Sequence, residues 1–394
     1  MKPLQQKLSK YTVPQEVKAK GVYPYFREIS SDQDTMVTMN GKRILMLGSN
    51  SYLGLTNHPK IKEAAKAAID KYGTGCAGSP FLNGTLDIHH KLEDILADFL
   101  GKDGVMLFSA GFQANSGVIP CITGRNDYVI FDEMDHASII EGKRLTFANT
   151  LKYRHNNMQD LERVLQRCPI DAAKLVVTDG VFSMEGDVAK LPEMQQLCDK
   201  YQATLMVDEA HGLGVFGREG RGVTDHFNLL DKTELIMGTF SKSLAAIGGF
   251  IAADKETINW MRHTVRPYIF TASIPPSATA SVIAAIEIMR SEPERQENLW
   301  KVANYALKSF REAGFEIGNT ETPIIPLYVR DNEKTFMVTK MLLDEGVFVN
   351  PVISPAVPPE DTLIRLAWMA THTIEQVDFA VDKTVKCFKK LGLL

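Results

Sequence analysis

The sequence has few cysteines, and no two of them lie close together in the chain. There are five, and no two form a C-x-x-C motif; they are Cys76, Cys121, Cys168, Cys198 and Cys387. This scatter argues against a disulfide framework or a zinc ribbon and is typical of proteins in a reducing cytoplasm.

Long apolar runs and a strong excess of one charge are also lacking. The N-terminus has no apolar segment of the signal-peptide type, and the apolar run LAAIGGFIAA is about half as long as a membrane span. The formal net charge of -4 at pH 7 gives no reason to expect a nucleic-acid partner. We therefore expect a cytoplasmic protein. The stretch 4–20 carries several lysines and few acids, so peripheral contact with the inner face of an anionic membrane is a further hypothesis.

The chain does have the length and hydrophobic content of a large globular protein. Its 394 residues are 44% hydrophobic, which suggests two or three subdomains. Short β-branched runs alternate with helical patterns; the runs cover residues 105–108, 128–131, 174–178, 204–208, 234–238 and 249–253. Continuous apolar runs of this length are typical of strands buried on both faces. We predict an α/β fold with a mostly parallel central sheet covered by helices.

The pattern of the sequence changes near residue 276. We therefore predict three parts: an N-terminal segment (1–45), a large α/β domain (46–275) and a smaller α+β domain (276–394). The smaller domain should begin with a helix near 277–290 and contain a strand at 323–329.

The end of the chain predicts an amphipathic helix. Thr373 is the expected N-cap, and Gln376 completes a capping box. The apolar face of this helix is formed by Ile374, Val377, Val381, Val385 and Phe388.

The segment VDEAHGLGVFG (207–217) places an acid and a histidine at the end of a predicted strand. Asp208 is well placed to contact a cationic ring nitrogen, although a carboxylate there can also cap the next turn. His211 follows three residues later. The segment also contains G-x-G-x-x-G, but a phosphate there would face acidic side chains, and no strand–turn–helix unit follows. An NAD enzyme built on Gly212–Gly217 is therefore kept only as an alternative.

The segment TFSKS (239–243) puts a lysine at the edge of an apolar run. A lysine amine must be neutral to act as a nucleophile, and burial beside dipoles favours the neutral form. The hydroxyls of Thr239 and Ser241 suit a phosphate. A lysine that carries an aldehyde, with an acid for a pyridinium nitrogen, is the signature of pyridoxal phosphate (PLP). The alternative is that Lys242 is a surface lysine at the start of a helix.

Two further segments follow predicted strands. SAGFQANSG (109–117) should open a helix whose first backbone N–H groups form an anion site, or are simply capped. In DEMDHASIIEG (132–142), His136 could stack on a flat ring or be structural, and the neighbouring acids have no spacing typical of a metal site. We interpret six other histidines as structural or surface residues; they are His58, His89, His90, His155, His226 and His263.

The order of these motifs is similar to that in the α-oxoamine synthases, which are fold-type I PLP enzymes. The resemblance covers nearly the whole chain, from LGSNSYLGL (47–55) to LIRLAWMATHT (363–373). It is carried by the phosphate turn at 109–117, His136, Ser183 in TDGVFSMEGD, Asp208-x-x-His211 and Thr239-x-Ser241-Lys242.

The resemblance implies roles for individual residues. Lys242 would hold the cofactor covalently and act as base and acid at the substrate α-carbon. Asp208 would pair with the protonated pyridine nitrogen, His211 and Ser183 would bind the phenolic oxygen, and His136 would stack on the ring and could touch the substrate carboxylate. The residues expected to hold the phosphate are Gly111, Phe112, Gln113, Thr239, Ser241 and, from the neighbouring subunit of a homodimer, Thr271.

The resemblance also implies a reaction. Asn50 and Arg365 match positions near the substrate, with Arg365 as the carboxylate anchor because a guanidinium grips a carboxylate through two hydrogen bonds. The segments YGTGCAGSPFLNG and NPVISPAVPPEDT are most similar to soluble bacterial members that condense L-serine with a long-chain acyl-CoA such as palmitoyl-CoA. The expected products are 3-ketodihydrosphingosine, CoA and CO2, in the first step of sphingolipid synthesis.

Alternatives within the family stay open. Sister enzymes use glycine with acetyl-CoA or alanine with pimeloyl-CoA, and the lysine motif does not separate them. A catalytically inactive regulatory subunit would lack the lysine that this chain has at position 242. Two positions depart from the family pattern: Pro80 stands where an arginine is usual, and Ile353 stands where some members have an arginine.

Overall fold

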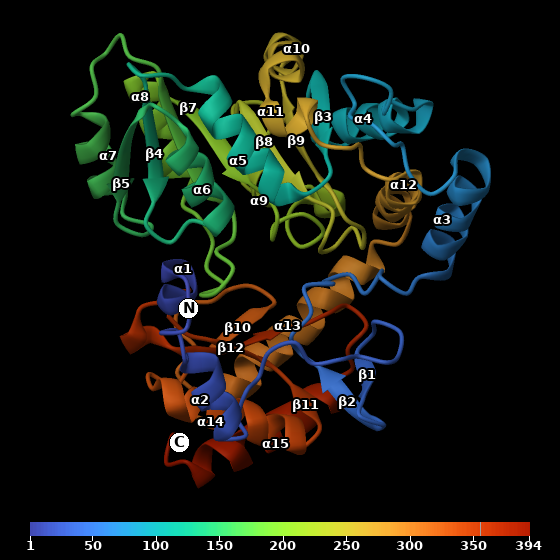
Figure 1. The fold of residues 1–394 in the computed structure, drawn as a ribbon, viewed down its shortest axis with the longest axis vertical. Helices are drawn as coiled ribbons and strands as arrows, with labels where there is room; N and C mark the ends of the chain where they lie inside the picture. The colour runs from blue at the N-terminus through green and yellow to red at the C-terminus, as the bar shows by residue number, and fades with distance from the viewer. Residues whose placement is uncertain (355) are drawn as a thin grey trace. The chain divides into compact units, whose positions relative to one another are not determined.

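The computed structural model describes residues 1–354 and 356–394, which form two compact units (Figure 1). The larger unit contains Asn50–Trp300 and Met369–Thr371, and the smaller unit contains Met1–Ser49, Lys301–Trp368 and His372–Leu394. The N-terminal segment thus belongs to the same unit as the end of the chain.

The division between the units falls later in the chain than the boundary that the sequence predicts near residue 276. The reason is the packing of α12 (Pro276–Ser291), which lies against α3 (Pro59–Tyr72) and α4 (Asp87–Leu100) of the larger unit. α12 itself lies where the sequence predicts a helix.

The larger unit is built on a seven-stranded sheet in the order β3-β9-β8-β7-β6-β4-β5. Its strands are β3 (Gly104–Phe108), β4 (Tyr128–Asp132), β5 (Asn149–Tyr153), β6 (Lys174–Asp179), β7 (Thr204–Asp208), β8 (Leu235–Thr239) and β9 (Gly249–Ala253). β9 runs antiparallel to both of its neighbours, and the other pairs are parallel. The predicted α/β fold with a mostly parallel sheet is confirmed.

Helices cover this sheet, and α5 lies against β8 and β9 (Figure 1). Besides α3, α4 and α12, the helices of this unit are α5 (Gly111–Ile122), α6 (Ala137–Leu145), α7 (Met158–Leu165), α8 (Leu191–Tyr201), α9 (Val223–His226), α10 (Lys255–Thr264) and α11 (Arg266–Ile269), with a short 3-10 helix η1 (Arg218–Gly220). Val118 of α5, Ile139 of α6 and Met261 of α10 are fully buried in one core cluster with strand side chains. Burial of such side chains is the main force that holds the layers together.

The strand ends place polar residues at one edge of the sheet. Asp132, Asp179, Asp208 and Thr239 are the last residues of β4, β6, β7 and β8, which are parallel to one another. Carboxyl ends of parallel strands meet at the same edge, where α/β proteins bind ligands.

The smaller unit has two three-stranded sheets. One is formed by β1 (Met36–Met39), β2 (Lys42–Met46) and β11 (Val347–Phe348), and the other by β10 (Ile324–Tyr328), β13 (Leu363–Ala367) and β12 (Asn350–Val352). Its helices are α1 (Pro3–Leu8), α2 (Val13–Ala19), α13 (Glu294–Glu312, mostly in this unit), α14 (Asn332–Asp344), α15 (Ile374–Lys390) and the 3-10 helix η2 (Pro359–Asp361). Within 1–354 and 356–394, no helix combines the length and the apolar character needed to cross a bilayer.

The C-terminal helix follows the sequence closely. Thr373 Oγ1 accepts a hydrogen bond from Gln376 N at 3.3 Å, and Gln376 Oε1 accepts one from Thr373 N at 3.1 Å, so the capping box is confirmed. On the predicted face, Val377 and Phe388 are fully buried, and Val381 and Val385 pack partly buried against the same core.

Candidate active site

Asp208 lies at the end of β7 and is only 2% exposed. Its Oδ2 accepts a hydrogen bond from Asn115 Nδ2 at 2.7 Å, and its Oδ1 accepts one from Ala210 N at 2.8 Å. Asn115 lies on α5 and also donates to Ser138 Oγ of α6 at 2.9 Å. These neutral donors orient the carboxylate and leave its charge available to a cation. The sequence reasoning missed Asn115, although it lies in the segment expected to open this helix.

His136 lies at the N-terminus of α6, close to Asp208 and to Lys242. Its Nδ1 accepts from Ser138 N at 3.3 Å, and its backbone N–H donates to Asp179 Oδ2 at 2.7 Å. Burial lowers the pKa of His136; the Asp208 charge opposes this effect and the Lys242 charge adds to it. The imidazole is therefore neutral at pH 7, which suits a ring that stacks on a flat cofactor.

Lys242 lies in the loop between β8 and β9 and is half-buried. Ser243 anchors this loop by donating to Leu213 O at 2.7 Å, and Ala245 takes a left-handed conformation with φ of 56°. Burial raises the pKa of Asp179, whereas the Lys242 charge lowers it, as it lowers that of His136. The Lys242 side chain thus lies near the acidic edge of the sheet, and Lys242 is not an isolated surface lysine at a helix start.

The N-terminus of α5 lies directly against the end of β8. A Cβ atom placed on Gly111 would lie 2.7 Å from Thr239 Oγ1, so only glycine allows this approach. Thr239 Oγ1 lies 3.0 Å from Ser241 Oγ, and the N-cap residue Ala110 has no side-chain oxygen. Two hydroxyl groups and a helix N-terminus thus converge, as in anion sites. Phe112 and Gln113 are in the same first turn.

His211 is buried and linked to Tyr52, a residue that the sequence reasoning missed. The Tyr52 hydroxyl lies 2.6 Å from His211 Nδ1, although the residues are far apart in the sequence. Ser183 is half-buried in the loop that follows β6. No pattern in the sequence pointed to Tyr52, which lies within the LGSNSYLGL segment.

The glycine-rich segment after Asp208 encloses a carboxylate of the chain itself. Glu209 Oε2 accepts from Val223 N at 2.9 Å and Oε1 accepts from Thr224 N at 2.6 Å. A Cβ atom on Gly212 would lie 1.9 Å from Glu209 Oε2. Burial raises the pKa of Glu209 to about 7 against the hydrogen bonds from Thr224 and Val223. A buried acid therefore fills the space that a dinucleotide phosphate would need, which disfavours the NAD alternative.

Thr271 and Asn50 belong to the larger unit, and Arg365 belongs to the smaller one. Thr271 lines a cavity of about 410 Å³, and Pro80 lines the same cavity. Asn50 Oδ1 is buried without a hydrogen-bond partner among the described residues. Arg365 is buried in the middle of β13 and is paired across the sheet with Pro326 and Asn350.

The residues present fit PLP. The larger unit brings together the Lys242 amine, a buried carboxylate with neutral donors, a neutral imidazole and an anion site. In addition, Gln113 Oε1 and Asn115 Oδ1 are buried without a hydrogen-bond partner within 1–354 and 356–394. Both oxygens can therefore accept a hydrogen bond from a ligand.

Comparison with known proteins agrees with this chemistry. The family model described as aminotransferase class I and II matches residues 42–383. A serine palmitoyltransferase from Bacteroides ovatus is 64% identical over 391 residues, which is 99% of both chains. An 8-amino-7-oxononanoate synthase from Thermosipho melanesiensis is 40% identical over 96% of this chain and 97% of that protein.

The solved structures point the same way. A serine palmitoyltransferase variant from S. paucimobilis, with bound PLP and myriocin, matches with a TM-score of 0.97 and 35% identity over 100% of both chains. The family uses PLP as its cofactor, and the residues of this site fit that group. The chain therefore belongs to the aminotransferase class I and II family, and within it to the serine palmitoyltransferases.

Proposed function

We propose that this chain is a PLP-dependent acyltransferase that condenses L-serine with a long-chain acyl-CoA. The observation that carries the proposal is the 64% identity to a serine palmitoyltransferase over 99% of the chain, against 40% for a sister synthase. In the reaction, the serine α-carbon first loses its proton, a C–C bond then forms between this carbon and the acyl carbon, and the thioester C–S bond breaks to release CoA. The bond from the α-carbon to the carboxylate then breaks to release CO2, and a proton returns to the α-carbon.

Bound PLP supplies an electron sink for the negative charge that develops at the α-carbon. Lys242 carries the cofactor and moves the proton at the α-carbon. Asp208 holds a proton at the pyridine nitrogen, a task for which a buried carboxylate with neutral donors is suited. Neutral His136 stacks on the ring, and His211, oriented by Tyr52, binds the phenolic oxygen together with Ser183.

The anion site binds the phosphate group. Gly111, Phe112 and Gln113 offer the first turn of α5, and Thr239 and Ser241 offer hydroxyl groups. Arg365 anchors the substrate carboxylate and Asn50 lies near the substrate, as the resemblance implies. Arg365 is buried, and a guanidinium can bind a carboxylate through two parallel hydrogen bonds.

Thr271 contributes to the phosphate site of a second copy in a homodimer. Its place on the wall of a cavity is consistent with a position where another chain inserts. The test mixes two impaired variants, Lys242→Ala and Thr271→Ala, after dissociation and reassociation. Mixed dimers with one intact site should regain activity, whereas active sites confined to one chain would give no gain.

The N-terminal helices provide a surface for anionic lipid. Leu4, Leu8 and Tyr11 are exposed here, among lysines such as Lys7 and Lys10. In a flotation assay at low salt, the protein should bind vesicles that contain phosphatidylglycerol and leave vesicles of phosphatidylcholine unbound. Equal behaviour with both vesicles would refute this contact.

The experiment that tests the main proposal offers the PLP-loaded protein a mixture of L-serine, glycine and L-alanine with palmitoyl-CoA, acetyl-CoA and pimeloyl-CoA. Mass spectrometry of the products should find mainly 3-ketodihydrosphingosine. A dominant product from alanine and pimeloyl-CoA, or from glycine and acetyl-CoA, would instead assign the chain to a sister activity.

A further inference from the structure

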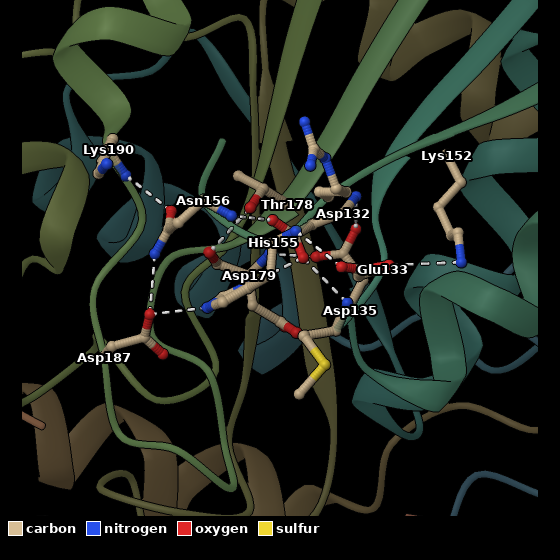
Figure 2. Close-up of polar contacts among 12 residues, drawn as sticks. Asp132, Glu133, Asp135, Lys152, His155, Asn156, Thr178, Asp179, Asp187 and Lys190 are labelled. Atoms are coloured by element: carbon tan, nitrogen blue, oxygen red, sulfur yellow. Dashed lines mark hydrogen bonds and ion pairs between the residues drawn. The ribbon is translucent and has the colours of Figure 1, made fainter. Parts of the chain in front are cut away.

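A protonated histidine joins two acidic turns next to the candidate site. His155 follows the edge strand β5, and Figure 2 shows it between Asp132 and Asp187. Its Nδ1 lies 2.9 Å from Asp132 Oδ1, and its Nε2 lies 2.8 Å from Asp187 Oδ2. Both ring nitrogens therefore have a carboxylate partner, which is the arrangement that an imidazolium requires.

The charge on His155 is stable at neutral pH. Burial disfavours it, but the hydrogen bonds to Asp132 and Asp187 outweigh burial and raise the pKa of His155 to about 10. The backbone N–H of His155 donates to Glu133 Oε1 at 3.2 Å, and Asn156 Nδ2 donates to Asp187 Oδ2 at 2.8 Å. The groups that face His155 are thus acids and neutral donors.

The contact between His155 and Asp187 fixes the loop that carries Ser183. The Phe182 N–H donates to Asp187 O at 3.0 Å, and the Phe182 ring meets the His155 ring edge to face at 4.4 Å. Val181 and Val188 close the same loop as an isolated β-bridge. His155 therefore holds residues on both sides of Ser183.

The contact between His155 and Asp132 fixes the turn that carries His136. Asp132 Oδ1 accepts from Met134 N at 2.9 Å, and Asp135 Oδ2 accepts from Asp132 N at 2.9 Å. Asp135 Oδ1 then accepts from Asp179 N at 3.0 Å, and Asp179 Oδ2 accepts from His136 N at 2.7 Å. A continuous series of hydrogen bonds thus leads from the His155 ring to the backbone of His136.

We propose that His155 is a positioning residue that holds the His136 turn and the Ser183 loop in register, through Asp132 and Asp187. The inference rests on the proposed function, because it is there that His136 and Ser183 receive their contacts to the cofactor ring. His155 itself touches neither cofactor nor substrate in this account; it fixes the distance between two groups that do.

The test uses His155→Gln, which offers one side-chain NH2 group and no charge where the wild type has two N–H groups and a charge. The matched control is His226→Gln, which changes an exposed histidine of the larger unit. In the PLP-loaded protein, hydrogen exchange of the amides at 181–188 should accelerate roughly tenfold or more in His155→Gln, because the loop loses its anchor. Its visible absorption should shift, and PLP should dissociate faster, whereas His226→Gln should match the wild type.

A second variant, Asp187→Asn, keeps an oxygen acceptor for His155 Nε2 and should show the same changes to a smaller extent. Asp187→Asn also tests the proposal if His155→Gln does not fold. Unchanged hydrogen exchange at 181–188 and unchanged visible absorption in Asp187→Asn would overturn the proposal. Unchanged exchange and absorption in a folded His155→Gln would overturn it as well. Wild-type protein that binds no PLP would refute the proposed function instead, whatever the variants do.

Discussion

Replacing His155 by glutamine should reduce stability more at acidic than at alkaline pH. The pKa of His155 is raised from 6.5 to about 10 in the folded protein by its bonds to Asp132 and Asp187. A raised pKa of this kind adds stability that is complete below the unfolded value of about 6.5, declines between the two values and is absent above about pH 10. Glutamine has no charge, so the variant lacks this contribution at every pH where the wild type has it.

The size of the effect follows from the same two values. The difference between 6.5 and about 10 corresponds to roughly 4–5 kcal/mol of unfolding free energy. The His155 side chain is 24% exposed, so solvent screening reduces the expected contribution to about 2–3 kcal/mol. In a folding unit of this size, that loss lowers the melting temperature by roughly 5–10 °C.

The assay is thermal unfolding of wild type, His155→Gln and the control His226→Gln between about pH 6 and pH 10.5. Comparing each variant with wild type at the same pH cancels the titration of shared acids such as Asp135 and Asp179, whose pKa values burial raises. The gap between wild type and His155→Gln should be largest near pH 6 and should close near pH 10.5. A gap that stays constant over this range would refute a charged His155.

Three further substitutions test the candidate site. Asp208→Asn keeps the size of the side chain but removes the charge at the pyridine nitrogen, so kcat should fall by roughly a hundredfold or more while thermal stability changes little. Gly111→Ala forces a methyl group against Thr239 Oγ1 at 2.7 Å, which should cost about 1–3 kcal/mol and weaken PLP binding in equilibrium dialysis; unchanged PLP affinity would argue against the phosphate site. Tyr52→Phe removes one hydrogen bond of His211, worth about 1 kcal/mol, and should shift the visible band of the loaded protein, whereas an identical spectrum would exclude this orientation of His211.

Much of the sheet could be predicted because buried parallel strands leave a strong local pattern. All six apolar runs became strands, and Asp208 and Thr239 are the last residues of the strands β7 and β8. The strand β5 was missed because it lies at the sheet edge and its sequence, NTLKY, is mostly polar and exposed. A strand with so few buried positions leaves neither a continuous apolar run nor a regular apolar alternation in the sequence.

The site residues that were missed depend on contacts between distant parts of the chain. Tyr52 meets His211 across 159 positions, and Asn115 meets Asp208 across 93. His155 has no motif of its own, and its two acidic partners lie on either side of it in the sequence. Such pairs become visible only when the strands are placed next to one another, because the sequence alone does not specify which turns lie side by side.

The central claim is that Lys242 carries PLP in a site that serves serine. The most direct measurement is the visible spectrum of the purified, PLP-treated protein, with Lys242→Ala as the control, during separate additions of L-serine, glycine and L-alanine. The account predicts a lysine-bound PLP band in the wild type only, and a response to L-serine at lower concentrations than to the other two amino acids. A band that is the same in Lys242→Ala, or no band in the wild type, would contradict it.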